Sequence, residues 1–82
     1  MEIRIHNISL NTTDTEIRKL FSPYGSVDSA RVNRNSLNGR SLKSGLVSMP
    51  VETQARQAIA SLDKSTFDGK IISVSEMPPD FY

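Results

Sequence analysis

The residues best suited to binding chemistry are cations grouped in one stretch of the chain. Residues 29–50 include Arg31, Arg34, Arg40 and Lys43 and no acidic residue, although the formal net charge of the 82 residues is only +1. Guanidinium and ammonium groups concentrated on one segment attract phosphates, and this local concentration indicates an anionic partner better than net charge does. The alternative is a solvated basic loop that has no partner.

Catalytic and metal chemistry have few candidate residues. The chain has no cysteine and a single histidine, His6, so disulfides and thiolate metal sites cannot form, and a zinc site would depend mostly on carboxylates. The turn expected at residues 7–11 has no glycine or basic residue to hold a phosphate, which argues against a small acylphosphatase-like hydrolase. No nucleophile has a base at a suitable spacing. We therefore expect no enzyme, no metal and no cofactor.

Length and composition indicate one small domain. The chain has 82 residues, and its 37% of hydrophobic residues is enough for a small core and argues against disorder. It has no run of about 18 apolar residues, and residues 1–4 lack a signal-peptide pattern. We therefore expect a soluble, cytoplasmic protein that does not bind a membrane.

Four segments have the pattern of short β-strands. Ile3 and Ile5 alternate with polar residues, which predicts a strand with one apolar face. Asn38-Gly39 is a strong hairpin signal, and Pro50 ends the strand that follows it. The predicted strands cover residues 3–8, 27–34, 42–49 and 70–77.

Two segments have helical periodicity. Thr13, with Glu16 three residues later, predicts a capping box, and an apolar stripe follows until Pro23 and Gly25 end the helix. A second stripe runs over residues 51–62. The order strand, helix, strand, strand, helix, strand predicts an α+β, ferredoxin-like βαββαβ sandwich, in which both helices cover one face of a four-stranded antiparallel sheet.

The other face of the predicted sheet is open. Because side chains alternate along a strand, the residues between the apolar positions point away from the helices. Such a mixed polar, basic and aliphatic surface can hold phosphates and hydrogen-bond to bases. On this face we expect Arg4, His6, Arg31, Asn33, Ile71, Ser73 and Ser75.

Several segments resemble the RNA recognition motif family. Residues 13–27 (TDTEIRKLFSPYGSV) resemble its first helix, and residues 3–8 (IRIHNI) resemble its hexapeptide. Residues 38–41 (NGRS) and 45–49 (GLVSM) resemble the approach to its octapeptide and the second half of it, and FDGKIISV near the end is similar to its last strand. The resemblance implies an RNA-recognition domain over residues 1–77 with a tail at 78–82, similar to the short single-domain members found in bacteria.

The family's aromatic positions are not aromatic in this chain. Members usually stack bases on rings at position two of the hexapeptide and positions three and five of the octapeptide, which here hold Arg4, Ser44 and Leu46. Each such stack is worth ~1–3 kcal/mol. A guanidinium plane or an imidazole also stacks on bases, so Arg4 and His6 are candidate substitutes. Lys43 stands where the octapeptide usually has glycine.

We therefore expect a non-catalytic module that binds single-stranded RNA weakly and with low sequence specificity. The expected RNA-binding residues are Arg4, His6, Arg31, Asn33, Arg34, Arg40, Lys43, Ser44, Leu46 and Ser73. The alternative is a degenerate member whose sheet face binds a protein partner or a second copy of itself through Leu42, Leu46 and Ile71. Phe81 and Tyr82 in the tail could cover the face or supply the missing rings.

Overall fold

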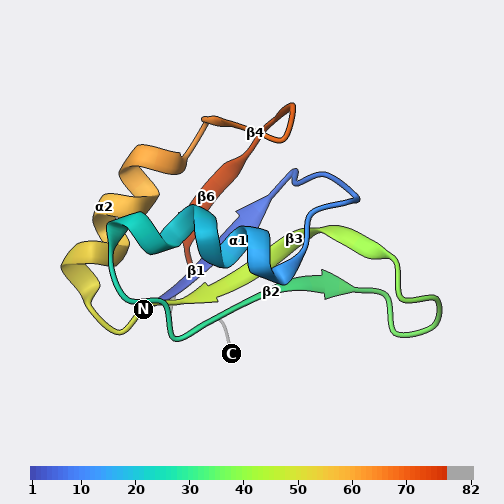
Figure 1. Ribbon diagram of the computed structural model, residues 1–82, viewed down its shortest axis with the longest axis horizontal. Helices are drawn as coiled ribbons and strands as arrows, with labels where there is room; N and C mark the ends of the chain where they lie inside the picture. The colour runs from blue at the N-terminus through green and yellow to red at the C-terminus, as the bar shows by residue number, and fades with distance from the viewer. Residues whose placement is uncertain (78–82) are drawn as a thin grey trace.

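Four strands form one antiparallel sheet in the order β2-β3-β1-β6, and both helices lie on the same face of it (Figure 1). The computed structural model describes residues 1–77, so Phe81 and Tyr82 lie outside the described part of the chain. This architecture confirms the predicted ferredoxin-like sandwich. The elements are β1 Glu2–His6, α1 Asp14–Phe21, the 3₁₀ helix η1 Ser22–Tyr24, β2 Ser29–Arg34, β3 Ser41–Ser48, α2 Glu52–Leu62, β4 Thr66–Phe67, β5 Lys70–Ile71 and β6 Ser73–Glu76.

Local side-chain chemistry sets the start of α1. Thr13 Oγ1 accepts a hydrogen bond from Glu16 N, and Glu16 Oε1 accepts one from Thr13 N, both at 3.2 Å. These reciprocal bonds satisfy two backbone donors that a helix start leaves unpaired, and they confirm the predicted capping box. On α2, Arg56 donates to Glu52 Oε1 at 2.6 Å, and this bond, together with the carboxylate's charge, raises the pKa of the guanidinium. Neither helix of the described chain is long and apolar enough to cross a membrane.

The core lies between the sheet and the two helices. Its side chains come from the apolar positions that alternate along the strands and from one stripe of each helix. Gly45 of β3 lets α1 approach closely, since a Cβ there would lie 2.8 Å from the Arg31 carbonyl oxygen and 3.0 Å from Ile17 Cδ1. The buried apolar residues are Ile3, Ile5, Ile8, Ile17, Phe21, Val32, Val47, Met49, Ala55, Ala58, Leu62, Ile72 and Val74.

All four predicted strands differ at their ends from those observed, and β3 differs least, since Ser41–Ser48 is displaced by one residue from the predicted 42–49. β1 stops at His6 because Asn7 adopts a left-handed conformation with φ 63°. β2 begins at Ser29 rather than residue 27, and Arg18 Nη1 instead holds the Val27 carbonyl at 2.9 Å. The predicted strand at residues 70–77 is divided into β5 and β6.

A local hairpin causes this division. Asp68 and Gly69 both have positive φ, at 53° and 78°, so the chain makes a tight turn and β5 pairs with β4. Such two-residue turns match the twist of antiparallel strands. The expectation that Ile71 belongs to the open face of the four-stranded sheet was therefore wrong, because Ile71 pairs with Thr66 in the small hairpin.

Carboxylates from the helical layer cap both outer strands of the sheet. Asp14 Oδ1 accepts from Val32 N of β2 at 2.8 Å, and Asp63 Oδ1 accepts from Val74 N of β6 at 2.9 Å. An exposed strand edge otherwise offers its N–H groups to other chains. These two bonds thus tie the helical layer to the sheet and block one edge donor on each side.

Removing the Asp14 carboxylate should destabilise the fold measurably. Asp14→Ala leaves the part-buried Val32 N–H without its charged acceptor, and we expect a loss of about 1.5–2 kcal/mol in the free energy of unfolding. Urea denaturation followed by circular dichroism measures this loss. Asp28→Ala removes the same charge from an exposed side chain and serves as the control. Equal stability losses in the two variants would contradict the capping role.

Candidate nucleic-acid interface

Two rows of side chains cross the open face of the sheet from β2 to β6. In the first row, Leu46 is in register with Arg31 on one side and Arg4 on the other, and Arg4 is in register with Ser75. Directly opposed side chains on one face lie about 4.5–5.5 Å apart at Cβ. The strand pairing therefore places an aliphatic side chain between two arginines at the centre of the face.

The second row is more polar. His6 of β1 is in register with Ser44 on one side and Ser73 on the other, and Asn33 Nδ2 donates to Ser44 Oγ at 3.1 Å. His6 and Ser73 are exposed, whereas Asn33 and Ser44 are half-buried. We call the two rows together the platform, which consists of Arg31, Leu46, Arg4, Ser75, Asn33, Ser44, His6 and Ser73.

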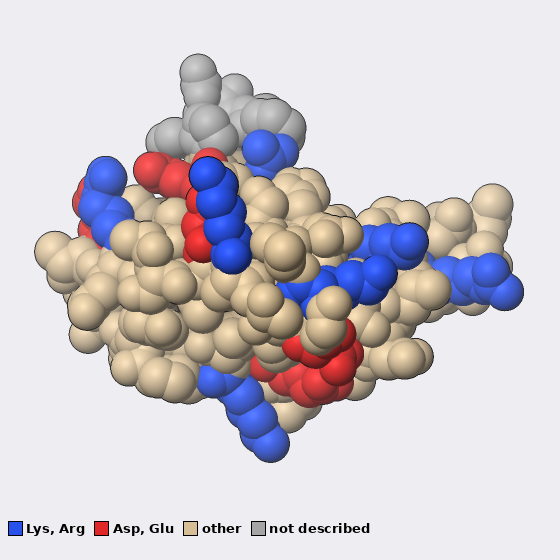
Figure 2. Space-filling view, turned by 90° about the horizontal axis from the view of Figure 1, so that it is seen from above, with Lys and Arg blue, Asp and Glu red and all other residues tan. Residues whose placement is uncertain are grey.

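The platform contains seven of the ten predicted RNA-binding residues. The other three, Arg34, Arg40 and Lys43, belong to the basic hairpin that joins β2 to β3, residues 34–43. In Figure 2, Lys and Arg side chains project at the right-hand end of the molecule, where Figure 1 places this hairpin. The structure therefore divides the predicted residues between the sheet face and the hairpin beside it.

Backbone and side-chain hydrogen bonds of two asparagines stabilise the hairpin loop. Asn35 N donates to Arg40 O at 2.8 Å, and Asn35 Oδ1 accepts from Leu37 N at 2.8 Å. Asn38 Oδ1 accepts from Arg40 N at 2.9 Å. Gly39 provides the positive φ, 71°, that the reversal requires. The backbone that carries Arg40 is therefore fixed by several hydrogen bonds.

Lys43 has an unusual backbone conformation. Its φ is 61°, and the β2–β3 register shifts between Val32 and Arg34, opposite this part of β3. The bulge turns the Lys43 carbonyl so that it accepts from Ile8 N at 3.2 Å. A left-handed conformation costs a residue with a Cβ about 1–2 kcal/mol, and glycine avoids this cost. A lysine here therefore combines backbone strain with a positive charge.

Lys43→Gly should separate these two effects. We expect the free energy of unfolding to rise by about 1 kcal/mol because the strain is relieved, while affinity for the single-stranded RNA that the sequence predicts as a partner falls about threefold because a cation is lost. Urea denaturation measures the first quantity and fluorescence anisotropy with labelled RNA the second. Lys43→Ala removes the charge but keeps the Cβ, so it should weaken binding without raising stability. A variant Lys43→Gly that is less stable than the parent protein would refute the strain argument.

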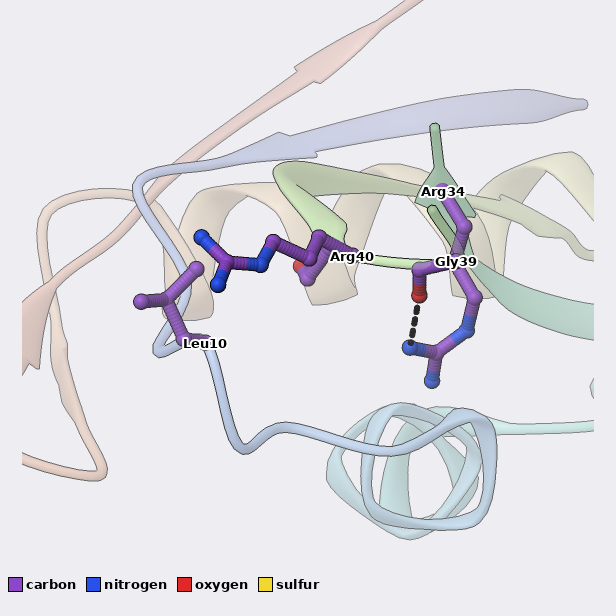
Figure 3. Close-up of a pocket in the computed structure, with 5 residues that line it drawn as sticks. Leu10, Arg34, Gly39 and Arg40 are labelled. Carbon is purple, nitrogen blue, oxygen red and sulfur yellow. Dashed lines mark hydrogen bonds between the residues drawn. The ribbon is translucent and has the colours of Figure 1, made fainter. Parts of the chain in front are cut away.

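A pocket of about 580 Å³ opens between the basic hairpin and the turn after β1. It is lined by Leu10, Arg34, Gly39, Arg40 and Ser41. Figure 3 shows the Arg40 guanidinium extending toward Leu10, while Arg34 Nη1 donates to Gly39 O at 3.5 Å. Arg34 follows the buried Val32 by two positions, so it projects on the helix side of β2 and not onto the platform.

Leu10 is a lining residue that the sequence did not single out. The turn at residues 7–11 lacks the glycine and the basic residue that a phosphate loop needs, so its residue types indicate no function. Leu10 becomes notable because the hairpin, some thirty positions later in the chain, folds back beside it and leaves it 58% exposed. No local pattern in the sequence signals this juxtaposition.

Comparisons with known proteins show what the chain and its fold are similar to. Over 73 residues the chain is 40% identical to a 28 kDa chloroplastic ribonucleoprotein of Nicotiana sylvestris, in a match that covers 89% of the chain and 26% of that protein. It is 30% identical to the putative RNA-binding protein RbpE of a Nostoc strain, over 96% of the chain and 80% of that protein. The crystal structure of RNA Binding Protein PG1 superposes with a TM-score of 0.90 at 34% identity, covering 95% of this chain and 98% of that one.

The fold and the platform define a βαββαβ domain with one open sheet face. The chain belongs to the RNA recognition motif family, whose model matches residues 3–73. This match confirms the resemblance inferred from the hexapeptide, the first helix and the last strand. The chain spans only about a quarter of the length of the chloroplast ribonucleoprotein, at 26%.

Proposed function

We propose that the chain is a non-catalytic module that binds single-stranded RNA through its platform and its basic hairpin. The observation that carries the proposal is the first platform row, in which Arg31 and Arg4 flank Leu46. Family membership and relatives named as ribonucleoproteins or RNA-binding proteins support it. A cytoplasmic location, expected from the sequence, is part of the proposal.

The platform offers contacts for both the backbone and the bases of RNA. The guanidinium groups of Arg4 and Arg31 contact phosphates or lie flat against bases, and Leu46 between them gives a base an aliphatic surface. In the second row, the hydroxyl groups of Ser44 and Ser73 and the imidazole of His6 hydrogen-bond to bases or to 2′-hydroxyl groups. None of these groups requires one particular base, so sequence specificity is low.

Binding should be weak and mainly electrostatic. Without rings on the central strands, the complex lacks stacks that are each worth ~1–3 kcal/mol. Phosphate contacts then supply most of the affinity, and the logarithm of the binding constant should fall linearly with the logarithm of salt concentration. With about four phosphates neutralised, the slope should be close to −3. A slope near zero with retained binding would contradict the electrostatic account.

An NMR titration of ¹⁵N-labelled protein tests the proposal. Mixed-sequence single-stranded RNA of about eight nucleotides is added at low salt and again in about 0.3 M salt. Amide shifts across the platform, at Arg4, His6, Arg31, Ser44 and Leu46, that shrink in the higher salt support the proposal. Shifts confined to the basic hairpin, or absent at low salt, would show that the sheet face has another use.

A charge variant provides an independent check. Arg31 is exposed on the platform, so Arg31→Ala should reduce RNA affinity about fivefold to tenfold without changing stability, because one phosphate or stacking contact is lost. Arg56→Ala removes an exposed arginine from α2, on the other face of the sheet, and should change affinity less than twofold, by roughly the long-range charge effect alone. Fluorescence anisotropy measures both. Similar losses in the two variants would mean that binding depends on overall charge and not on the platform.

A second candidate function is a protein interface, and the exposed aliphatic side chains favour it. Leu42 is 56% exposed and Ile71 is 64% exposed. Both lie near the end of β1, since Ile8 N donates to Lys43 O and Asn7 Nδ2 donates to Ile71 O. Sedimentation velocity at high protein concentration tests self-association, which would appear as a dimer lost in Leu42→Ser. A monomer at every concentration argues against self-association.

A further inference from the structure

We infer that the pocket between the basic hairpin and Leu10 holds one nucleotide of the RNA strand after that strand leaves the platform. This inference rests on the proposed function, because the nucleotide belongs to the same bound RNA. The pocket is separate from the platform, since Arg34 projects on the helix side of the sheet. It therefore adds a contact that the sheet face alone does not provide.

The lining of the pocket suits a nucleotide. Arg34 and Arg40 bring two guanidinium groups, which pair with phosphates and also lie flat on bases. Leu10, 58% exposed, presents an apolar wall that a base would cover. The volume of about 580 Å³ is within the range of about 300–1,000 Å³ that is usual for small-ligand sites. Charge for the phosphate and apolar surface for the base thus occur together.

The pocket is also held in shape before any ligand binds. Arg40 N donates to Asn38 Oδ1, Arg40 O accepts from Asn35 N, and the Arg34 guanidinium donates to Gly39 O. These bonds fix the hairpin backbone around the cavity. A ligand therefore does not have to order the loop, which lowers the entropic cost of binding.

The position of the pocket favours RNA over an acidic peptide. Asn33 belongs to the platform and Arg34, the next residue of β2, lines the pocket, so the two surfaces meet at the edge of the sheet. A strand that crosses the second platform row and then turns around this edge therefore reaches the pocket. An acidic peptide would use the two arginines but would leave the apolar wall of Leu10 without a flat partner.

A length series of RNA tests the inference. Oligouridylates of about four and about ten nucleotides are compared by fluorescence anisotropy on the parent protein, on Leu10→Ala and on Arg40→Gln. Each variant should bind the longer RNA about fivefold to tenfold more weakly than the parent protein does, yet lose less than about twofold on the shorter RNA, which the platform alone accommodates. Val51→Ala changes an exposed aliphatic residue at the start of α2, and Lys19→Gln removes a charge from α1, so both should resemble the parent protein.

Each outcome bears on one claim. Equal losses on both lengths, or no loss on either, would overturn the nucleotide pocket while leaving the platform intact. NMR shifts of the Leu10 amide on addition of an Asp- and Glu-rich peptide, but not on addition of RNA, would overturn the nucleotide pocket in favour of a protein ligand. If the parent protein binds neither oligouridylate, and the Arg31 amide does not shift in the NMR titration with RNA, the proposed function itself fails, together with the pocket.

Discussion

Phenylalanine at positions 44 and 46 should raise the affinity for single-stranded RNA by about tenfold per ring. Ser44 and Leu46 are half-buried platform residues on β3, and each faces a residue of β1, His6 or Arg4. A ring at either position would give a base a stacking surface worth ~1–3 kcal/mol, and the middle of that range exceeds a tenfold gain. The double variant should therefore bind about a hundredfold more tightly, if the two gains add.

Fluorescence anisotropy with labelled single-stranded RNA measures the gain. The slope of the logarithm of the binding constant against the logarithm of salt concentration should stay the same, because stacking does not release counterions. The salt-dependent share of the binding free energy should therefore fall. Gln57→Phe places the same ring on an exposed position of α2 and controls for nonspecific association. If rings on β3 leave affinity unchanged or reduce it, bases do not lie on this face, and the protein-interface hypothesis gains support.

Gly45→Ala should destabilise the fold by about 2 kcal/mol. The new Cβ would lie 2.8 Å from the Arg31 carbonyl oxygen, 3.0 Å from Ile17 Cδ1 and 3.2 Å from Ile5 Cγ2. Backbone on one side and core side chains on the other leave little room to relax, and overpacking of this kind typically costs about 1–3 kcal/mol. Urea denaturation followed by circular dichroism measures the change.

A second glycine separates crowding from backbone conformation. Gly69 has a φ of 78°, but a Cβ added there would meet only open space, so Gly69→Ala should cost about 1 kcal/mol through conformation alone. Gly45 has no such φ, and its cost comes from contact. If Gly45→Ala were as stable as the parent protein, α1 would have to shift away from β3 without loss of packing.

Much of the fold was predictable because the deciding interactions are local. The capping box of Thr13 and Glu16 spans three residues, and the alternation of apolar residues in β1 and β2 needs only each strand's own pattern. The same alternation correctly predicted that Arg4 and His6 share one face, and the resemblance to the family's octapeptide correctly placed Ser44 and Leu46 beside them. The prediction for Ile71 failed because a tight turn at Asp68 and Gly69 pairs that segment locally, and apolar periodicity does not distinguish a broken strand from a continuous one.

The candidate site was only partly predictable. The residue types at the family's aromatic positions are visible in the chain, so the absence of rings at Arg4, Ser44 and Leu46 required no structure. The backbone strain at Lys43 was not predictable from the sequence, because the positive φ of this residue arises from a bulge in the pairing of β2 with β3. That these residues bind RNA stays a prediction, which the variants above are designed to test.

The amino-acid sequence by itself determined the order of the elements, the family and the chemistry of each strand face, because capping, alternation and motif spacing depend on residues close together in the chain. Only the tertiary structure decided that Arg31 and Arg4 flank Leu46, and that Arg34, Arg40 and Leu10 meet around a pocket. Strand register and the return of the hairpin beside the first turn bring together residues that are distant in the chain. Such contacts depend on how whole elements pack, which no local pattern specifies.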